Sequence, residues 1–140
     1  MKEAFKEGYS FEKTVSYTEQ ELIKMAKYCG DMNFVHHDAA DAKQTRFQSI
    51  IASGSAITAI FTALIPTHYS EISPMLGLEM SLKFPAPIFP DQLITMSWQV
   101  KGSQFASNGD QILSLAGKIQ DKHGQDLVLA ETKILLLENL

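Results

Sequence analysis

The sequence predicts an α+β fold in which an antiparallel sheet wraps around one long, buried central helix. The helix is indicated by residues 53–65, where no charge occurs and apolar residues cover most of the helical circumference. Residues 76–84 and 94–100 alternate apolar and polar side chains, as half-buried strands do, and two further strands are expected over 112–119 and 127–137. A sheet packed on a single helix is the simplest way to bury both apolar surfaces.

Shorter elements are expected before the long helix. Ser10–Tyr17 alternates in the manner of a strand. Thr18 and Glu21 then have the spacing of a capping box, which predicts a helix that ends at Gly30. A loop over residues 31–37 follows, and Asp38 caps a short helix.

The boundaries of the later elements are marked by turn residues. Ser53 and Gly54 can start the long helix, and Pro66 marks its expected end. Asn108-Gly109 predicts a hairpin turn, and residues 121–124 predict a second one. The 140 residues contain no repeat and no linker, so we expect a single domain over 1–140.

Composition argues against several classes of partner. The formal net charge is −4 and no Lys/Arg cluster occurs, which argues against nucleic acid or an anionic membrane as the main partner. Cys29 is the single cysteine, so no intrachain disulfide can form. The first residues lack the apolar run of a signal peptide, and no apolar stretch reaches membrane-spanning length. We therefore expect a cytoplasmic protein.

Gly30–His36 is the segment that carries chemical information. It reads G-D-M-N-F-V-H and places the carboxylate of Asp31, the carboxamide of Asn33 and the imidazole of His36 in one loop. A carboxylate and an imidazole held close together can share and activate one water molecule. This is general acid–base chemistry without a metal or an organic cofactor.

The chain resembles MaoC-type, or (R)-specific, enoyl-CoA hydratases, which have a hot-dog fold. In that family a G-D-x-N-P-[LIV]-H signature precedes a buried helix that starts near an A-H-G or A-S-G triplet. The corresponding residues here are Gly30–His36 and Ala52-Ser53-Gly54. Phe34 stands where the signature has proline, which removes a fixed φ angle and adds a large apolar side chain.

The resemblance implies a role for each matching residue. Asp31 and His36 would together bind the catalytic water, and the backbone N–H of Gly54 would bind the thioester carbonyl. The last role also has a physical basis, because the free N–H groups at a helix N-terminus stabilise developing negative charge. The resemblance further suggests substrate-side or bracing roles for Asn33, Ser53 and Thr62.

Several residues also have plainer interpretations. His37 is expected to face away from the site, since neighbouring side chains in an extended loop point in opposite directions. A metal site formed by His36, His37 and Asp38 would need a further ligand. Ser53 is expected to be an N-cap rather than a nucleophile, and Thr62 can bond back to its own helix. Core packing is expected for Cys29, Trp98 and the methionines at strand spacing, Met80 and Met96.

The leading hypothesis is reversible hydration of a trans-2-enoyl thioester to a 3-hydroxyacyl thioester. The rival enzyme is a hot-dog thioesterase, which usually has an acidic residue on or beside the central helix, and residues 53–66 contain none. A non-catalytic acyl-thioester-binding module is the third possibility. The family resemblance implies a homodimer and a coenzyme A or acyl carrier protein thioester; Lys83 and Lys101 are scattered candidates for a basic docking patch.

Overall fold

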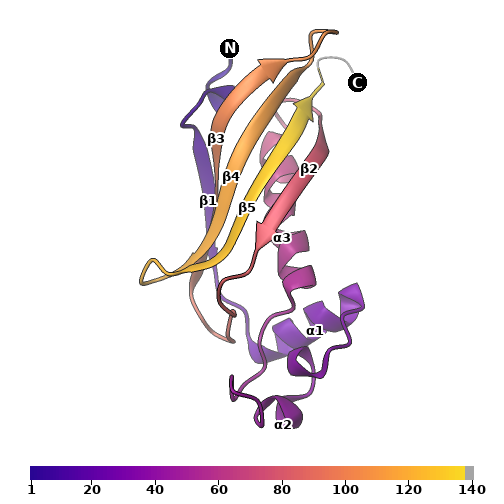
Figure 1. Ribbon diagram of the computed structural model, residues 1–140, viewed down its shortest axis with the longest axis vertical. Coiled ribbons are helices and arrows are strands. Elements are labelled where there is room, and N and C mark those ends of the chain that lie inside the picture. The colour runs from indigo at the N-terminus through magenta and orange to yellow at the C-terminus, as the bar shows by residue number, and fades with distance from the viewer. Residues whose placement is uncertain (138–140) are drawn as a thin grey trace.

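A five-stranded antiparallel sheet packs one face against a single long helix in the computed structural model, which describes residues 1–137 (Figure 1). The strands lie in the order β1-β3-β4-β5-β2, so β1 and β2 form the two edges. The strands are β1 (Ser10–Val15), β2 (Met75–Lys83), β3 (Ile94–Phe105), β4 (Gln111–Asp121) and β5 (Asp126–Leu136). The helices are η1 (Glu3–Phe5), α1 (Glu19–Cys29), η2 (Phe34–His36), α2 (Ala39–Ala42) and α3 (Gly54–Tyr69). The predicted α+β architecture around a central helix is confirmed.

The capping residues set the ends of α1 as the sequence predicts. The hydroxyl of Thr18 accepts the Glu21 N–H at 3.1 Å, and the Glu21 carboxylate accepts the Thr18 N–H at 3.0 Å. Gly30 ends the helix with a φ of 85°, a conformation that costs glycine little because it has no Cβ.

The central helix α3 extends one turn beyond its predicted end. Pro66 lies inside the helix, which continues to Tyr69. A proline removes one helical N–H, but Pro66 is on the exposed side, where water can reach the carbonyl that this N–H would have bonded. The last turn is held by Tyr69, whose buried hydroxyl donates to the Ala4 carbonyl at 2.8 Å. The prediction that the helix ends at Pro66 was therefore wrong.

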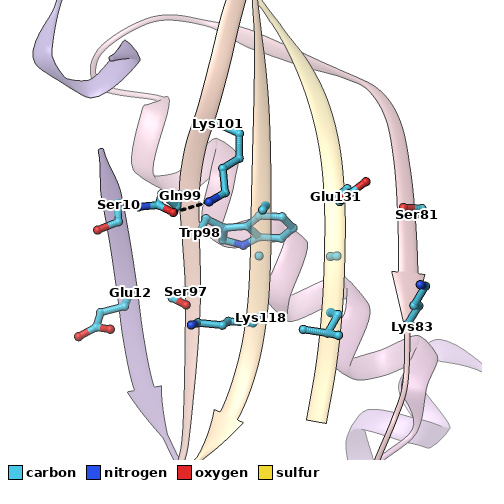
Figure 2. A pocket seen from close by; sticks show the side chains of 14 residues that line it. Ser10, Glu12, Ser81, Lys83, Ser97, Trp98, Gln99, Lys101, Lys118 and Glu131 are labelled. Carbon is cyan, nitrogen blue, oxygen red and sulfur yellow. Dashed lines mark hydrogen bonds between the residues drawn. The ribbon is translucent and has the colours of Figure 1, made fainter. Parts of the chain in front are cut away.

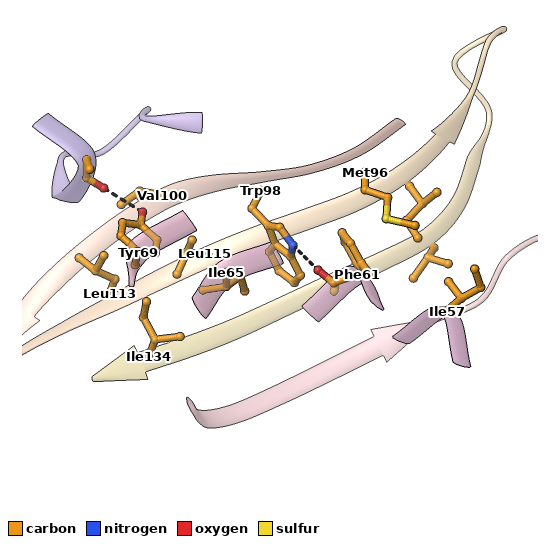
Figure 3. Packing of buried hydrophobic residues seen from close by; sticks show 14 of the residues in the cluster. Ile57, Phe61, Ile65, Tyr69, Met96, Trp98, Val100, Leu113, Leu115 and Ile134 are labelled. Carbon is orange, nitrogen blue, oxygen red and sulfur yellow. Dashed lines mark hydrogen bonds between the residues drawn. The ribbon is translucent and has the colours of Figure 1, made fainter. Parts of the chain in front are cut away.

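The core lies between α3 and the inner face of the sheet (Figure 3). Phe61 on α3 stacks on Trp98 of β3 with ring centroids 4.4 Å apart, and the Trp98 indole N–H donates to the Phe61 carbonyl at 3.0 Å. Gly117 of β4 makes room for this indole, because a Cβ there would lie 2.4 Å from Trp98 Cε3. The core role predicted for Trp98 is confirmed.

One side of α3 remains uncovered, contrary to the expectation of a helix buried nearly all round. Ala56, Ile57 and Phe61 are buried, whereas Ser55, Ala59 and Ala63 are exposed. A single sheet covers only one side of a helix, so the small residues on the other side face outward.

Edge strand β2 also exposes apolar side chains. Leu76, Leu78 and Met80 retain 53%, 49% and 40% of their accessible surface. The core role predicted for the methionines therefore holds for Met96 but not for Met80. Cys29 is exposed as well, so its predicted place in the core was wrong.

A separate small core supports the segment that carries the signature residues. Leu22, Val35, Ala42 and Ile50 are buried together, which fixes α1, η2 and α2 beyond one end of the sheet (Figure 1). The chain between α1 and α3 is thereby held beside the start of α3. Within residues 1–137, no helix has the length and apolar character needed to cross a membrane.

Candidate acid–base site

Asp31 is placed by the end of α1. Its backbone N–H and that of Gly30 both reach the carbonyl of Ala26, which closes the last helical turn. The carboxylate is then fixed at both oxygens: Oδ2 accepts the Ser53 hydroxyl at 2.6 Å, and Oδ1 accepts the Asn33 backbone N–H at 3.2 Å.

These hydrogen bonds favour the ionised form of Asp31. The Ser53 hydroxyl is the largest cause that lowers the pKa of this carboxyl. The Asn33 N–H and electrostatic attraction to the nearby imidazoles of His36 and His37 lower the pKa further, and partial burial opposes them. Asp31 is therefore a carboxylate, and an acceptor of hydrogen bonds, at neutral pH.

His36 lies on η2 with its ring largely buried. Its Nδ1 lies 2.9 Å from the carbonyl oxygen of Ile51. A carbonyl can only accept, so Nδ1 carries the hydrogen, and the neutral ring has its lone pair on Nε2. Nε2 lies 3.5 Å from Asp31 Oδ2. The carboxylate and the basic ring nitrogen thus face each other.

Ser53 and Gly54 bring the start of α3 to this pair. Ser53 is buried and caps the helix, its hydroxyl accepting the Ala56 N–H at 3.2 Å while donating to Asp31. Gly54 is the first residue of α3. The ring of Phe84 lies over it, so that a Cβ on Gly54 would lie 3.3 Å from Phe84 Cε1.

Two openings meet at Gly54 and Phe84. One is a cleft of about 340 Å³ whose lining includes His36, Arg46 and the apolar side chains of Phe47 and Ile57. The other is shallower and is lined by Asp31, Gly54, Ser55, Thr58 and Phe84. The two members of the acid–base pair therefore face different openings that share one border.

A larger hollow of about 570 Å³ lies on the outer face of the sheet, with α3 behind it (Figure 2). Small side chains such as Ser97 and Ser81 form its floor, and three lysines and two glutamates surround them: Lys83, Lys101, Lys118, Glu12 and Glu131. None of the predicted catalytic or substrate-binding residues lines this hollow, although Lys83 and Lys101, the candidates for a docking patch, do.

The structure therefore brings together four of the predicted site residues: Asp31, His36, Ser53 and Gly54. Of the other two, Asn33 joins this group only in part and Thr62 does not join it. Asn33 reaches Asp31 with its backbone N–H and has an exposed side chain. Thr62 lines neither opening, and its hydroxyl bonds back to the Ala59 carbonyl.

The lining of the two openings includes residues that were not among the predicted ones, notably Thr58, Phe84 and Arg46. Thr58 lies on α3 one turn after Gly54. A hydroxyl among apolar helix residues is only a weak sequence signal of a site residue. Arg46 lies between His36 and Gly54 in the sequence and Phe84 lies far after them, and nothing in their spacing marks either as a site residue.

His37 does not join the acid–base pair. Its Nε2 lies 2.9 Å from the Met32 carbonyl oxygen, so it braces the loop. Residues 1–137 contain no group of three or more side chains arranged to hold a metal ion.

The sheet around one central helix defines a hot-dog domain, and the carboxylate and imidazole at the start of that helix form a candidate acid–base site. The chain belongs to the MaoC-like domain family, whose sequence profile matches residues 1–123. No curated protein matches the sequence.

Solved structures of the same fold include (R)-hydratases. R-hydratase PhaJ1 from Pseudomonas aeruginosa in the unliganded form is 27% identical, with a TM-score of 0.78 over 96% of this chain and 83% of that one. The (R)-hydratase from A. caviae involved in PHA biosynthesis is 22% identical, with a TM-score of 0.83 over 97% of this chain and 100% of that one. A MaoC-like dehydratase from Rhodospirillum rubrum is 17% identical, with a TM-score of 0.83 over 99% and 97% of the two chains. The last two likenesses establish the fold alone.

Proposed function

We propose that this protein hydrates trans-2-enoyl thioesters to (R)-3-hydroxyacyl thioesters and catalyses the reverse dehydration. The observation that carries the proposal is the Asp31–His36 pair, with Oδ2 and Nε2 3.5 Å apart and the Nδ1 hydrogen fixed on the Ile51 carbonyl. Membership of a dehydratase-like family and similarity to (R)-hydratases support the same reaction.

The pair can hold one water molecule. A water oxygen about 2.8 Å from both Oδ2 and Nε2 would form hydrogen bonds to each, since both atoms accept. As the water oxygen bonds to C3 of the substrate, one of its protons passes to Nε2. The resulting imidazolium, stabilised by the Asp31 carboxylate, then returns a proton to C2. The C2=C3 π bond is lost, H and OH are added, and the site regains its starting charge.

Gly54 would stabilise the charge that develops on the substrate. During addition, negative charge moves to the thioester oxygen, and the N–H groups at the start of α3 are donors aimed at such a charge. Loss of one donor of this kind costs about 3–4 kcal/mol of barrier. Because Gly54 has no Cβ, the substrate oxygen can approach its backbone closely.

Substitution of either member of the pair tests this proposal. We expect Asp31→Asn and His36→Ala each to lower kcat for crotonyl-CoA hydration by at least about 10²-fold, as loss of a general acid or base does. The measurement is loss of the enoyl chromophore, and His123→Gln, in the exposed turn between β4 and β5, is the control. Near-normal turnover in either site variant would refute the assignment.

Two other outcomes would identify the rival functions. Release of free thiol in step with loss of the enoyl-thioester absorbance would identify a thioesterase, because hydration removes the same absorbance without releasing thiol. Acyl-thioester binding with neither reaction would identify a binding module, for which the exposed Phe34 in place of the family proline is the sequence feature to examine.

The proposal also covers assembly and location. We expect a homodimer in which a second copy covers the exposed side of α3 and the apolar side chains of β2.

Residues 1–140 would act as one domain, because β5, which lies beyond the residues matched by the family profile, pairs with β4 and β2. The carrier would be coenzyme A or an acyl carrier protein, and the location cytoplasmic.

A further inference from the structure

Arg46 is the only arginine in the sequence, and it lies at the cleft that also contains His36 and Gly54. Its side chain is exposed, so it stands at the mouth of the cleft rather than in its wall. The other residues that line this cleft, His36 apart, are apolar or glycine. Arg46 therefore supplies the one permanent charge in a largely apolar cleft.

The backbone under Arg46 is held in place by a tight turn. The Thr45 hydroxyl donates to the Ala42 carbonyl at 2.7 Å, and the N–H groups of Phe47 and Gln48 reach the oxygens of Thr45. Gln48 has a φ of 55°, in the region that favours glycine, so the turn is fixed despite some backbone strain. Phe47 anchors the turn against the small core of Leu22, Val35, Ala42 and Ile50.

The guanidinium group has no ionic partner within the described part of the chain. No salt bridge or hydrogen bond from its side chain occurs there, and its nearest notable neighbour is the Phe47 ring, 5.2 Å from Cζ to the ring centroid. A guanidinium resting on an aromatic ring keeps its planar N–H edge free, and that edge matches the two oxygens of a phosphate or carboxylate.

We propose that Arg46 binds an anionic group of the thioester substrate at the mouth of this cleft. The inference rests on the proposed function, since it places the reacting end of the substrate between Asp31, His36 and Gly54. The anion has two possible sources: a phosphate of the carrier, or a carboxylate on the acyl chain. Both groups present negatively charged oxygens to the guanidinium, and substrates that carry only one of the two groups distinguish between them.

The test compares Arg46→Gln with wild type on three substrates. Crotonyl-CoA carries carrier phosphates, crotonyl-N-acetylcysteamine carries none, and glutaconyl-N-acetylcysteamine carries only an acyl carboxylate. If Arg46 binds phosphate, the variant has a KM for crotonyl-CoA at least about tenfold higher than wild type, whereas its KM for crotonyl-N-acetylcysteamine is unchanged. If it binds a carboxylate, wild type prefers the glutaconyl over the crotonyl thioester, and the variant loses that preference. In both cases kcat stays near its wild-type value.

Lys43→Gln is the matched control, because Lys43 is an exposed cation three residues earlier that does not line the cleft. Arg46→Lys keeps the charge but loses the planar edge, and we expect an intermediate KM. The inference is overturned if Arg46→Gln and Lys43→Gln behave alike on all three substrates.

Calorimetric titration separates this inference from the proposed function. Coenzyme A and the glutaryl amide of N-acetylethylenediamine, which has nitrogen in place of the thioester sulfur, are titrated into wild type and Arg46→Gln. Absence of hydration by wild type would refute the proposed function, while weaker binding of either probe by the variant would still support Arg46 as an anion-binding residue. Equal binding of both probes by the two proteins would overturn that role.

Discussion

At the residue scale, one hydroxyl connects helix formation to the chemistry of the site. Ser53 caps α3 through the Ala56 N–H and donates to the Asp31 carboxylate at 2.6 Å. The same side chain therefore sets the start of the helix and the ionisation of the carboxylate that would act on water. The two effects can be measured separately.

We predict that Ser53→Ala raises the pKa of Asp31 toward the ordinary value of an aspartate. The hydroxyl is the main cause of the low pKa, so its loss makes protonation easier. If Asp31 must be ionised, the acid limb of the pH–rate profile moves to higher pH. The same variant loses a helix cap and should be about 0.5–2 kcal/mol less stable.

Ser70→Ala, at the other end of α3, is the control for this experiment. Its hydroxyl bonds only to the Thr67 carbonyl, so its acid limb should match that of wild type. An unchanged acid limb in Ser53→Ala, together with lower stability, would mean that Ser53 serves only as a cap.

The sequence predicted the proximity of single residues where those residues lie close together along the chain or mark the end of a helix. Asp31 and His36 lie in one loop, and Ser53 with Gly54 starts a helix, so short-range spacing was informative. The exposure of Cys29 was not predictable in this way, because it depends on how far α1 extends beyond the sheet.

At the scale of elements, the packing of α3 on the sheet depends on one missing side chain. Trp98 stacks on Phe61 and occupies the space beside Gly117, where a Cβ would lie 2.4 Å from the indole. A Cβ on residue 117 would meet the rigid indole ring itself. Rotation at the end of a flexible side chain therefore cannot relieve the clash.

We predict that Gly117→Ala destabilises the protein by about 1–3 kcal/mol, the usual cost of overpacking a core. The measurement is urea unfolding followed by the fluorescence of Trp98, the only tryptophan. Gly102→Ala on β3 is the control, because a Cβ there meets nothing within 4 Å. Equal stabilities of the two variants would show that the indole can move aside.

Local sequence signals predicted where most elements begin, but not how much of each element's surface is covered by the rest of the fold. Thr18, Gly30 and Ser53 mark helix ends through bonds within a few residues, and the sequence identified them. The outward side of α3 looks apolar because its small residues, such as Ala59 and Ala63, resemble core residues in composition. Only the position of the sheet shows which side is covered.

At the scale of the whole molecule, packing one sheet on one helix leaves two apolar surfaces of the described residues uncovered. The first is the small-residue side of α3 and the second is the row Leu76, Leu78 and Met80 on edge strand β2. Exposed apolar surface on an edge strand favours pairing with another chain. The expected homodimer would cover both.

We predict that the wild-type protein is a dimer and that Leu78→Glu shifts it to a monomer. A charge at a buried interface position is costly unless it is paired. Light scattering after size exclusion gives the mass directly. Leu93→Glu, which also changes a half-exposed leucine but lies between β2 and β3, is the control. A monomeric wild type, or a dimer unaffected by Leu78→Glu, would contradict this surface.

The architecture of one sheet on one central helix could be predicted from order and patterning, whereas the two openings could not. Asp31 and the start of α3 are close because of the small core under α1, but Phe84 and Arg46 reach them from segments with no common pattern. The hollow on the outer face shows the converse: it gathers Lys83, Lys101 and Lys118, yet Glu12 and Glu131 offset most of their charge (Figure 2). A basic docking patch does not follow from such a mixed surface.

The strand order also determines when the site can be completed as the chain is synthesised. Among the five described strands β2 pairs with β5 alone, and β5 is synthesised after the other four. Phe84, which directly follows β2 and covers Gly54, therefore has no fixed support until residues 126–136 have emerged. A nascent chain that stops before β5 carries the acid–base pair and the central helix but lacks the strand that would hold one wall of the site in place.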